Sequence, residues 1–152
     1  MNMRIFESLV EIEAAVGEPL GTTDWVAIEQ KQVDAFADIT GDHQWIHVDV
    51  ERAKGSPFGG TIAHGYLTLA LLPGFGGGLF RIDAGSARLN YGVDKLRFPS
   101  PLPVGSRVRA TPTFASVTAV PAGTQVKTRW VVEAEGSDKP VCVADAITLV
   151  VP

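Results

Sequence analysis

The side chains of this sequence best suited to chemistry are a carboxylate and two imidazoles within six consecutive positions. Asp42, His43 and His47 follow a predicted helix that ends at Gly41, and the third histidine, His64, comes after a glycine-rich connection. Proton-handling groups gathered in a short non-helical segment are what general acid–base catalysis on a bound substrate requires. A polar loop that merely contains histidines is the alternative, and this motif by itself leaves both open.

A metal site is the first competing interpretation of these histidines. His43 and His47 are four residues apart, the spacing found on zincin helices, but Gln44 stands where such a site needs a glutamate base. Gly41 also ends the helix before His43, so the spacing need not place both rings on one face. We therefore expect no metal at this position.

The sequence also lacks the common motifs for nucleophilic catalysis and phosphate binding. No Gly-x-Ser-x-Gly motif occurs, and the single cysteine, Cys142, lies in an apolar run where a buried, unreactive thiol is expected. The glycine-rich stretch at 74–78 matches neither a phosphate loop nor a dinucleotide fingerprint. We expect this stretch to be a connection, and we expect no cofactor.

Length and composition describe an ordinary globular protein. The 152 residues fit one domain spanning 1–152, and 45% are hydrophobic and 20% charged. The net charge of -4 provides no basic surface for nucleic acid. The longest apolar stretch, 66–80, is interrupted by Pro73 and is too short to span a bilayer. Because charged residues replace the apolar core of a signal peptide, we expect a soluble, cytoplasmic protein.

The elements that must position the histidines are predicted from apolar periodicity. Gly41 supplies a left-handed stop for the helix before the motif, which places Asp42 directly after that helix. The expected elements in this half of the chain are helices over 5–16 and 29–39, a strand over 20–28 and a helical turn over 48–53.

The apolar segment 61–72 determines the architecture that we expect. It is hydrophobic on almost every face and Pro73 ends it, so this helix must be enclosed. Pro112 indicates an edge or a bulge in one strand of the enclosing sheet. The fold class is α+β, a hot-dog arrangement in which an antiparallel sheet wraps a long apolar central helix, and its open edge favours a homodimer. The predicted strands are 88–98, 106–120, 124–135 and 141–151.

Three blocks of the sequence resemble the MaoC-like (R)-specific enoyl-CoA hydratases. They are 36–47 with Ala53, then 58–65, then 93–105, and their order and spacing agree with that family. The first block contains an aromatic residue, a Gly-Asp pair and a histidine five residues after the aspartate. Gln44-Trp45 replaces the usual Asn-Pro pair. The Gln44-Trp45 pair resembles a NodN-like branch of the family. We expect it to affect the acyl-chain preference more than the acid–base chemistry.

The resemblance implies an acid–base mechanism at Asp42 and His47. The two side chains would hold a water molecule that adds to C3 of a trans-2-enoyl thioester while C2 receives a proton. Which of the two accepts the proton of the water stays open. The main-chain N–H of Gly65, at the start of the apolar helix, would donate to the thioester oxygen as negative charge develops there.

Further substrate contacts are expected from Ala63, His64, Trp45 and Asn90. A histidine at a helix start more often makes a structural hydrogen bond, so that role is favoured for His64. Trp45 either walls an acyl tunnel or fills the core, and Asn90 either lines the pocket or belongs to strand packing.

The expected function is that of an (R)-specific enoyl-CoA hydratase, a hydro-lyase of fatty acid metabolism that makes (R)-3-hydroxyacyl-CoA from trans-2-enoyl-CoA. The substrate thioester would carry coenzyme A or acyl carrier protein. A hot-dog thioesterase and a non-catalytic acyl-chain binding protein are the alternatives, and the intact spacing of Asp42 and His47 favours the hydratase. Acyl-chain length, carrier, pathway and physiological direction are left open.

Overall fold

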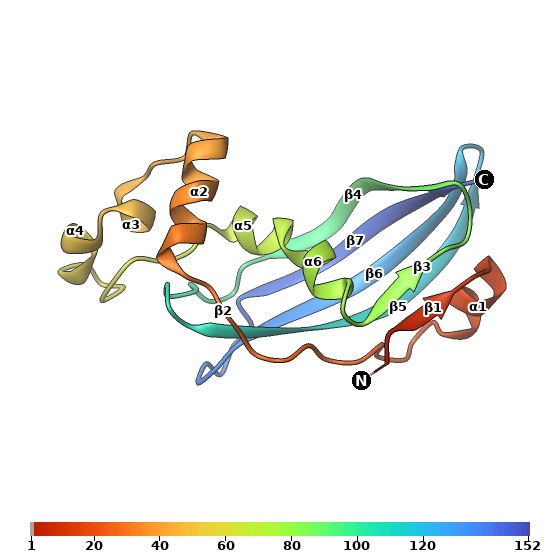
Figure 1. The fold of residues 1–152 in the computed structure, drawn as a ribbon, viewed down its shortest axis with the longest axis horizontal. Coiled ribbons are helices and arrows are strands. Elements are labelled where there is room, and N and C mark those ends of the chain that lie inside the picture. The colour runs from red at the N-terminus through yellow and green to blue at the C-terminus, as the bar shows by residue number, and fades with distance from the viewer. Residues whose placement is uncertain (1) are drawn as a thin grey trace.

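Four long strands in the second half of the chain define the fold of the computed structural model, which describes residues 2–152 (Figure 1). With a short fifth strand they form one antiparallel sheet in the order β2-β5-β6-β7-β4. The four long strands are confirmed to within about one residue at each end. They are β4 (Ala87–Arg97), β5 (Arg107–Val120), β6 (Gly123–Ala134) and β7 (Cys142–Val151), and the short one is β2 (Val26–Ala27).

Residue alternation explains why one face of this sheet is buried. On β6 the side chains of Val126, Thr128 and Trp130 are buried, while Arg129 between them points outward and pairs with Asp145 of β7. A strand with one apolar and one polar face belongs to a sheet covered on one side. The neighbouring β7 is largely buried on both faces, as expected for a central strand.

Pro112 lies on the outer edge of β5, as predicted. Its carbonyl oxygen accepts a hydrogen bond of 2.9 Å from the N–H of Leu20, so the side of the residue that lacks an N–H faces away from β6. The ladder with β6 therefore loses no hydrogen bond at the proline. The β-bulge of this pair comes slightly later, between Phe114 and Ser116.

The central helix is divided into two short helices that lie against the curled sheet, α5 (Gly65–Ala70) and α6 (Leu72–Gly76) (Figure 1). The prediction of one helix over 61–72 was wrong at both ends. Residues 61–64 are extended, and the N–H of Ala63 donates to the carbonyl of Leu102. Pro73 does not end the helix, because it sits in the first turn of α6, where no N–H is needed.

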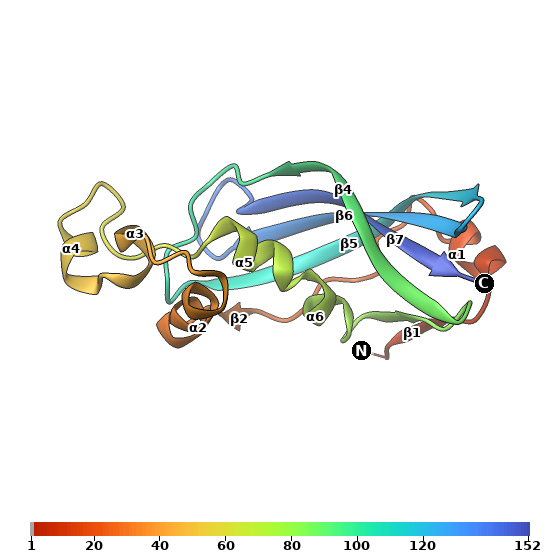
Figure 2. The same ribbon diagram turned by 90° about the horizontal axis from the view of Figure 1, so that it is seen from above.

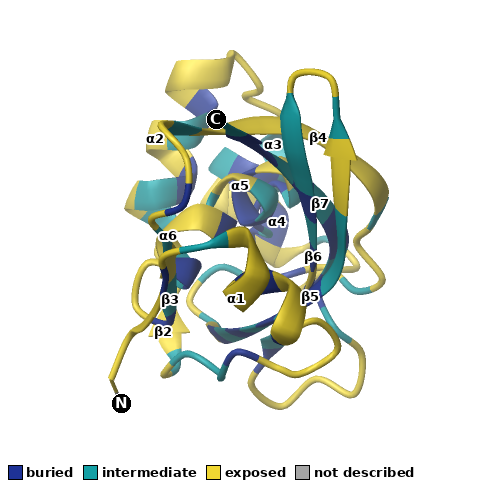
Figure 3. Ribbon diagram, turned by 90° about the vertical axis from the view of Figure 1, so that its right-hand side faces the viewer, coloured by how far each residue is buried: buried dark blue, intermediate teal, exposed yellow. Residues whose placement is uncertain are grey.

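The sheet covers one side of these helices, which is the hot-dog arrangement expected from the sequence. Leu67 and Leu72 are buried against it, with 6% and 3% of their surfaces exposed. Tyr66 on the opposite side is 68% exposed, so the single chain does not enclose the helix on every side. Strand β4, which could close that side, is itself exposed along most of its length (Figure 3).

The first part of the chain is less regular than predicted. The helix over 5–16 is confirmed only at its centre, α1 (Leu9–Ala14), because the residues before it form β1 (Arg4–Phe6) and pair in parallel with β3 (Phe80–Ile82). The strand expected over 20–28 is reduced to β2, and its earlier part makes isolated hydrogen bonds to β5. These short pairings depend on contacts with distant segments, which periodicity does not report.

Helices α2 (Gln30–Thr40), α3 (Trp45–Val48) and α4 (Val50–Lys54) gather at the end of the molecule opposite α1 (Figure 2). Gly41 ends α2 with a left-handed backbone, φ 79°, as predicted. Asp49 caps α4 by accepting from the N–H of Arg52. Within residues 2–152, no helix has the length and apolar character needed to cross a membrane.

Candidate active site

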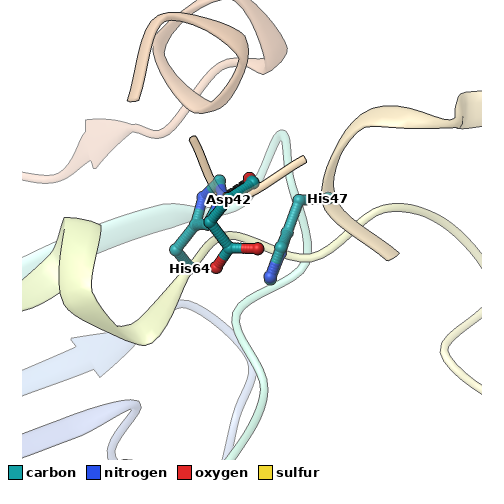
Figure 4. Close-up of side chains that lie close together, drawn as sticks. All are labelled: Asp42, His47 and His64. Atoms are coloured by element: carbon teal, nitrogen blue, oxygen red, sulfur yellow. Dashed lines mark hydrogen bonds between the residues drawn. The ribbon is translucent and has the colours of Figure 1, made fainter. Parts of the chain in front are cut away.

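Three segments converge on the side chains of Asp42, His47 and His64. Asp42 follows α2, His47 belongs to α3, and His64 is the residue before α5. One possible ligand atom of each side chain lies within 4.8 Å of the other two. The close-up shows the three side chains grouped together (Figure 4). The two histidines are 7% and 3% exposed, whereas Asp42 is exposed. The site therefore consists of two buried imidazoles beside a solvent-accessible carboxylate.

The tautomer of His47 follows from the hydrogen bond that its ring makes. Its Nδ1 lies 2.6 Å from the carbonyl oxygen of Ile62, and a carbonyl can only accept, so Nδ1 carries the proton. Nε2 of the neutral ring is left with its lone pair. His47 also lines a cavity of about 220 Å³ together with Gly65 and Ala63. The ring therefore presents a proton acceptor at a site large enough for a small group.

The carboxylate of Asp42 has little to hold it within the chain. Its Oδ1 accepts only a long bond of 3.4 Å from the N–H of Gln44. Two hydrogen bonds of about 2.8 Å that meet at one water molecule span roughly 4.6 Å. The 4.8 Å limit on the separation between Asp42 and His47 is compatible with such a bridge. The separation therefore leaves room for one water molecule between the two side chains.

Gly65 is placed at the same cavity as His47, at the first position of α5. Helical N–H groups in the first turn have no partner within their own helix, so the N–H of Gly65 is available to a bound group. A Cβ atom at Gly65 would lie 2.8 Å from the ring of Phe98. Glycine is thus required here because an aromatic ring packs directly on the backbone, in addition to the expected approach of a substrate.

The other predicted contact residues are divided between this site and the rest of the molecule. Ala63 is buried and lines the small cavity. Asn90 lies on β4 and lines a different cavity of about 700 Å³, beside α5 and α6. Trp45 is covered by the guanidinium of Arg52, 4.2 Å from its ring centre, and lines neither cavity.

His43 points away from the cluster. Its Nε2 lies 2.9 Å from Oδ1 of Asp38 on α2, and this hydrogen bond raises the pKa of the exposed His43 ring. The spacing of His43 and His47 therefore does not create a two-histidine metal site. The other pair, His47 and His64, stacks with ring centres 3.8 Å apart and planes 23° apart. Because ring nitrogens bind metals in the ring plane, two nearly parallel rings direct their lone pairs alongside each other rather than to one point.

Gln30 supports the site through two hydrogen bonds, a role that was not predicted from the sequence. Its Nε2 donates to the carbonyl of His47 at 2.8 Å, and its Oε1 accepts from the hydroxyl of the buried Thr61 at 2.6 Å. One side chain thus connects α2, α3 and the segment that leads into α5. A glutamine in the first turn of an amphipathic helix is ordinarily a surface residue, so no sequence pattern could reveal this role.

Cys142 lies away from this site, in β7. It is fully buried, and burial raises the pKa of its thiol to about 11. The thiolate is therefore scarce at neutral pH. The prediction of a buried cysteine is confirmed.

Known proteins that resemble this chain include thioester dehydratases. Residues 11–135 match the family described as MaoC like domain. The 3-hydroxyacyl-thioester dehydratase Z of Mycobacterium tuberculosis is 53% identical over 146 residues, which cover 95% of this chain and 97% of that protein. Nodulation protein N of Rhizobium leguminosarum bv. viciae is 43% identical over 146 residues, covering 94% and 91%. A solved structure from Archaeoglobus, a monoamine oxidase regulatory protein, has the same fold, with a TM-score of 0.79 at 22% identity over 99% of this chain and 98% of that one.

Proposed function

Because this chain belongs to the MaoC-like dehydratase family, we propose that it interconverts trans-2-enoyl and (R)-3-hydroxyacyl thioesters by adding or removing water. The observation that carries the proposal is the convergence of Asp42 and His47, together with the cavity that His47 shares with Gly65. The similarity to 3-hydroxyacyl-thioester dehydratase Z supports the reaction class. The expected relation to NodN proteins is confirmed by the match to nodulation protein N.

In the hydration direction, a water molecule bridges the carboxylate of Asp42 and Nε2 of His47. The water oxygen bonds to C3 of the enoyl thioester, and its proton passes to one member of the pair. The electrons of the double bond move toward the thioester carbonyl, whose oxygen becomes negative and accepts a hydrogen bond from the N–H of Gly65. A proton then reaches C2, so the product differs from the substrate by one water. Dehydration is the reverse of these steps.

The substrate is proposed to be a thioester of coenzyme A, with acyl carrier protein as the other carrier that the same chemistry would accept. The reacting atoms belong to the acyl group and the thioester, so the site residues Asp42, His47 and Gly65 serve either carrier. The exposed side of α5 and the unpaired edge of β4 support a homodimer as the working unit.

The test is an enoyl-CoA hydration assay, followed as loss of enoyl absorbance across several chain lengths, with the product configuration determined. Asp42→Asn and His47→Gln each remove an acid–base group while keeping a similar shape, and each should lower kcat by about 100-fold or more. His43→Gln is the matched control, because His43 lies in the same segment but pairs with Asp38 outside the site. It should retain wild-type activity.

Three outcomes would contradict the proposal. Wild-type kcat in Asp42→Asn or in His47→Gln would remove the acid–base pair from the mechanism. Release of free coenzyme A from a saturated acyl-CoA, without hydration of enoyl-CoA, would indicate a thioesterase. Tight acyl-CoA binding without turnover at any chain length would indicate a binding protein.

A further inference from the structure

We infer that His64 is a positioning residue, which holds Asp42 in place by a hydrogen bond to the Asp42 main chain and does not contact the substrate. The inference rests on the proposed function, because it concerns the residue that would hold the reacting water. The contact joins Nε2 of His64 to the carbonyl oxygen of Asp42 at 2.9 Å.

This contact is the main connection between Asp42 and the remainder of the fold. Residues 41–44 have no regular structure between α2 and α3. Across residues 2–152, Asp42 makes two other hydrogen bonds, from its N–H to the hydroxyl of Thr40 and from the N–H of Gln44 to its Oδ1. Both measure 3.4 Å, beyond the usual range of such bonds, and both partners are its near neighbours in the chain. The bond from His64 is the one that reaches across the fold.

The imidazole of His64 is itself firmly placed. It is 3% exposed, and it lies between the ring of Phe36, 5.0 Å away, and the ring of His47, 3.8 Å away. The ring is therefore packed between α2 and α3 while its main chain begins α5. The small cavity that His47 and Gly65 share is lined by neither His64 nor Asp42, whose main chain His64 contacts. This placement favours support of the loop over contact with substrate.

Hydrogen bonding also assigns the tautomer of His64. A carbonyl oxygen only accepts, so Nε2 carries the proton. Nδ1 is buried and has no partner among the described residues. With its proton on Nε2, the His64 ring donates toward Asp42, whereas the free nitrogen of His47 is an acceptor.

Two substitutions of His64 distinguish the effect of its hydrogen-bond donor from the effect of the packing of its ring. His64→Gln keeps an N–H₂ group at a reach similar to Nε2 but loses the ring. His64→Phe keeps an aromatic ring for stacking on His47 but cannot donate. Because a displacement of about 1 Å in a reacting group can cost about 100-fold in rate, we expect His64→Phe to lower kcat by about that factor with KM within about threefold. His64→Gln should recover kcat to within about tenfold of wild type, and thermal unfolding should show both variants folded.

Several results would overturn the inference. Wild-type kcat in His64→Phe would show that the hydrogen bond is not needed, and an increase in KM at constant kcat would indicate a substrate contact. Equal loss in both variants would assign the effect to packing. A failure of the proposed function looks different, because the wild-type protein would then be inactive before any substitution was made.

A measurement independent of activity tests the same contact. Nitrogen-15 chemical shifts of the His64 ring should show a protonated Nε2 and an unprotonated Nδ1. Amide hydrogen exchange over residues 42–44 should be faster in His64→Phe than in the wild-type protein or in His64→Gln. The opposite tautomer, or unchanged exchange in His64→Phe, would refute the positioning role whether or not an enzyme activity is found.

Discussion

The two buried imidazoles each make one ring hydrogen bond with a main-chain carbonyl, and they use different nitrogens to do so. His47 donates from Nδ1 to Ile62, and His64 donates from Nε2 to Asp42. A neutral imidazole has one donor and one acceptor, so the choice of nitrogen decides which side of the ring can accept a proton. Two residues of the same type therefore take different roles, one suited to proton transfer and the other to support.

A prediction at this scale concerns Gln30. Gln30→Met should lower the free energy of unfolding by about 1–3 kcal/mol, because the buried hydroxyl of Thr61 loses its acceptor. Lys31→Met at the next, exposed position is the control and should change stability by no more than about 0.5 kcal/mol. Denaturant unfolding measures both. Adding Thr61→Val to Gln30→Met should restore part of the loss, and strict additivity of the two changes would refute this explanation.

The ion pair on the outer face of the sheet predicts a dependence of stability on pH. Hydrogen bonds from Arg129 hold the pKa of the Asp145 carboxyl below its ordinary value. As pH falls, the unfolded chain therefore binds the proton first, so this contribution is present above about pH 4 and is lost as pH falls through the folded-state pKa. Asp145→Asn should be less stable than wild type at pH 7, and the difference should shrink below about pH 4. Asp138→Asn, in an exposed turn, is the control, and a difference that grew in acid would contradict the assignment.

At the scale of elements, the position of the segment that holds Asp42 depends on how helix α2 ends. Gly41 adopts φ 79°, and beyond its own part of the chain no atom of residues 2–152 lies within 4 Å of where its Cβ would be, so a side chain there meets conformational strain and no steric clash. Gly55 at the end of α4 has φ -88° and is equally uncrowded, since a Cβ there would come no closer than 3.9 Å to another group. The two glycines differ chiefly in the sign of φ.

The matched substitutions follow from this comparison. Gly41→Ala should destabilise the protein by about 1–2 kcal/mol, because a residue with a Cβ is disfavoured in the left-handed region. Gly55→Ala should be neutral or stabilising by up to about 1 kcal/mol, because alanine reduces the freedom of the unfolded chain. Thermal or denaturant unfolding gives both values. Equal effects at the two positions would show that backbone conformation does not decide the cost.

At the scale of the whole molecule, one side of the fold leaves a strand edge unpaired and apolar side chains exposed. Strand β4 forms an edge of the sheet, and Leu89 and Tyr91 on it are 50% and 61% exposed. Tyr66 on α5 is 68% exposed and contacts the ring of Phe98, which follows β4. Exposed apolar residues along an unpaired strand are typical of a surface that another chain covers.

We therefore expect the wild-type protein to have twice the mass of the chain in size-exclusion chromatography with light scattering. Leu89→Asp and Tyr91→Asp should shift it toward the single-chain mass, because each places a charge on the covered surface. Ile39→Asp, at an 84% exposed position on α2, is the control and should leave the mass unchanged. A wild-type protein with the mass of one chain at micromolar concentration would contradict the homodimer.

The sequence by itself determined the features that short-range patterns encode. Extended runs separated by turn residues located the four long strands, Gly41 marked the end of α2, and Pro112 indicated an edge or a bulge in β5. The motif that contains Asp42 and His47, through its resemblance to a known family, identified the candidate acid–base pair. Each of these depends on neighbours within a few residues, through backbone preference or the face that a side chain takes.

Only the tertiary structure decided which distant residues meet. It brought His64 against Asp42, connected Gln30 to Thr61, and placed Asn90 beside a second cavity rather than at the histidines. It also showed that the apolar segment continues past Pro73 as a second short helix, α6, after a break at Leu71. Such contacts join segments that are tens of residues apart, and their geometry is set by packing of the whole fold, which no local pattern contains.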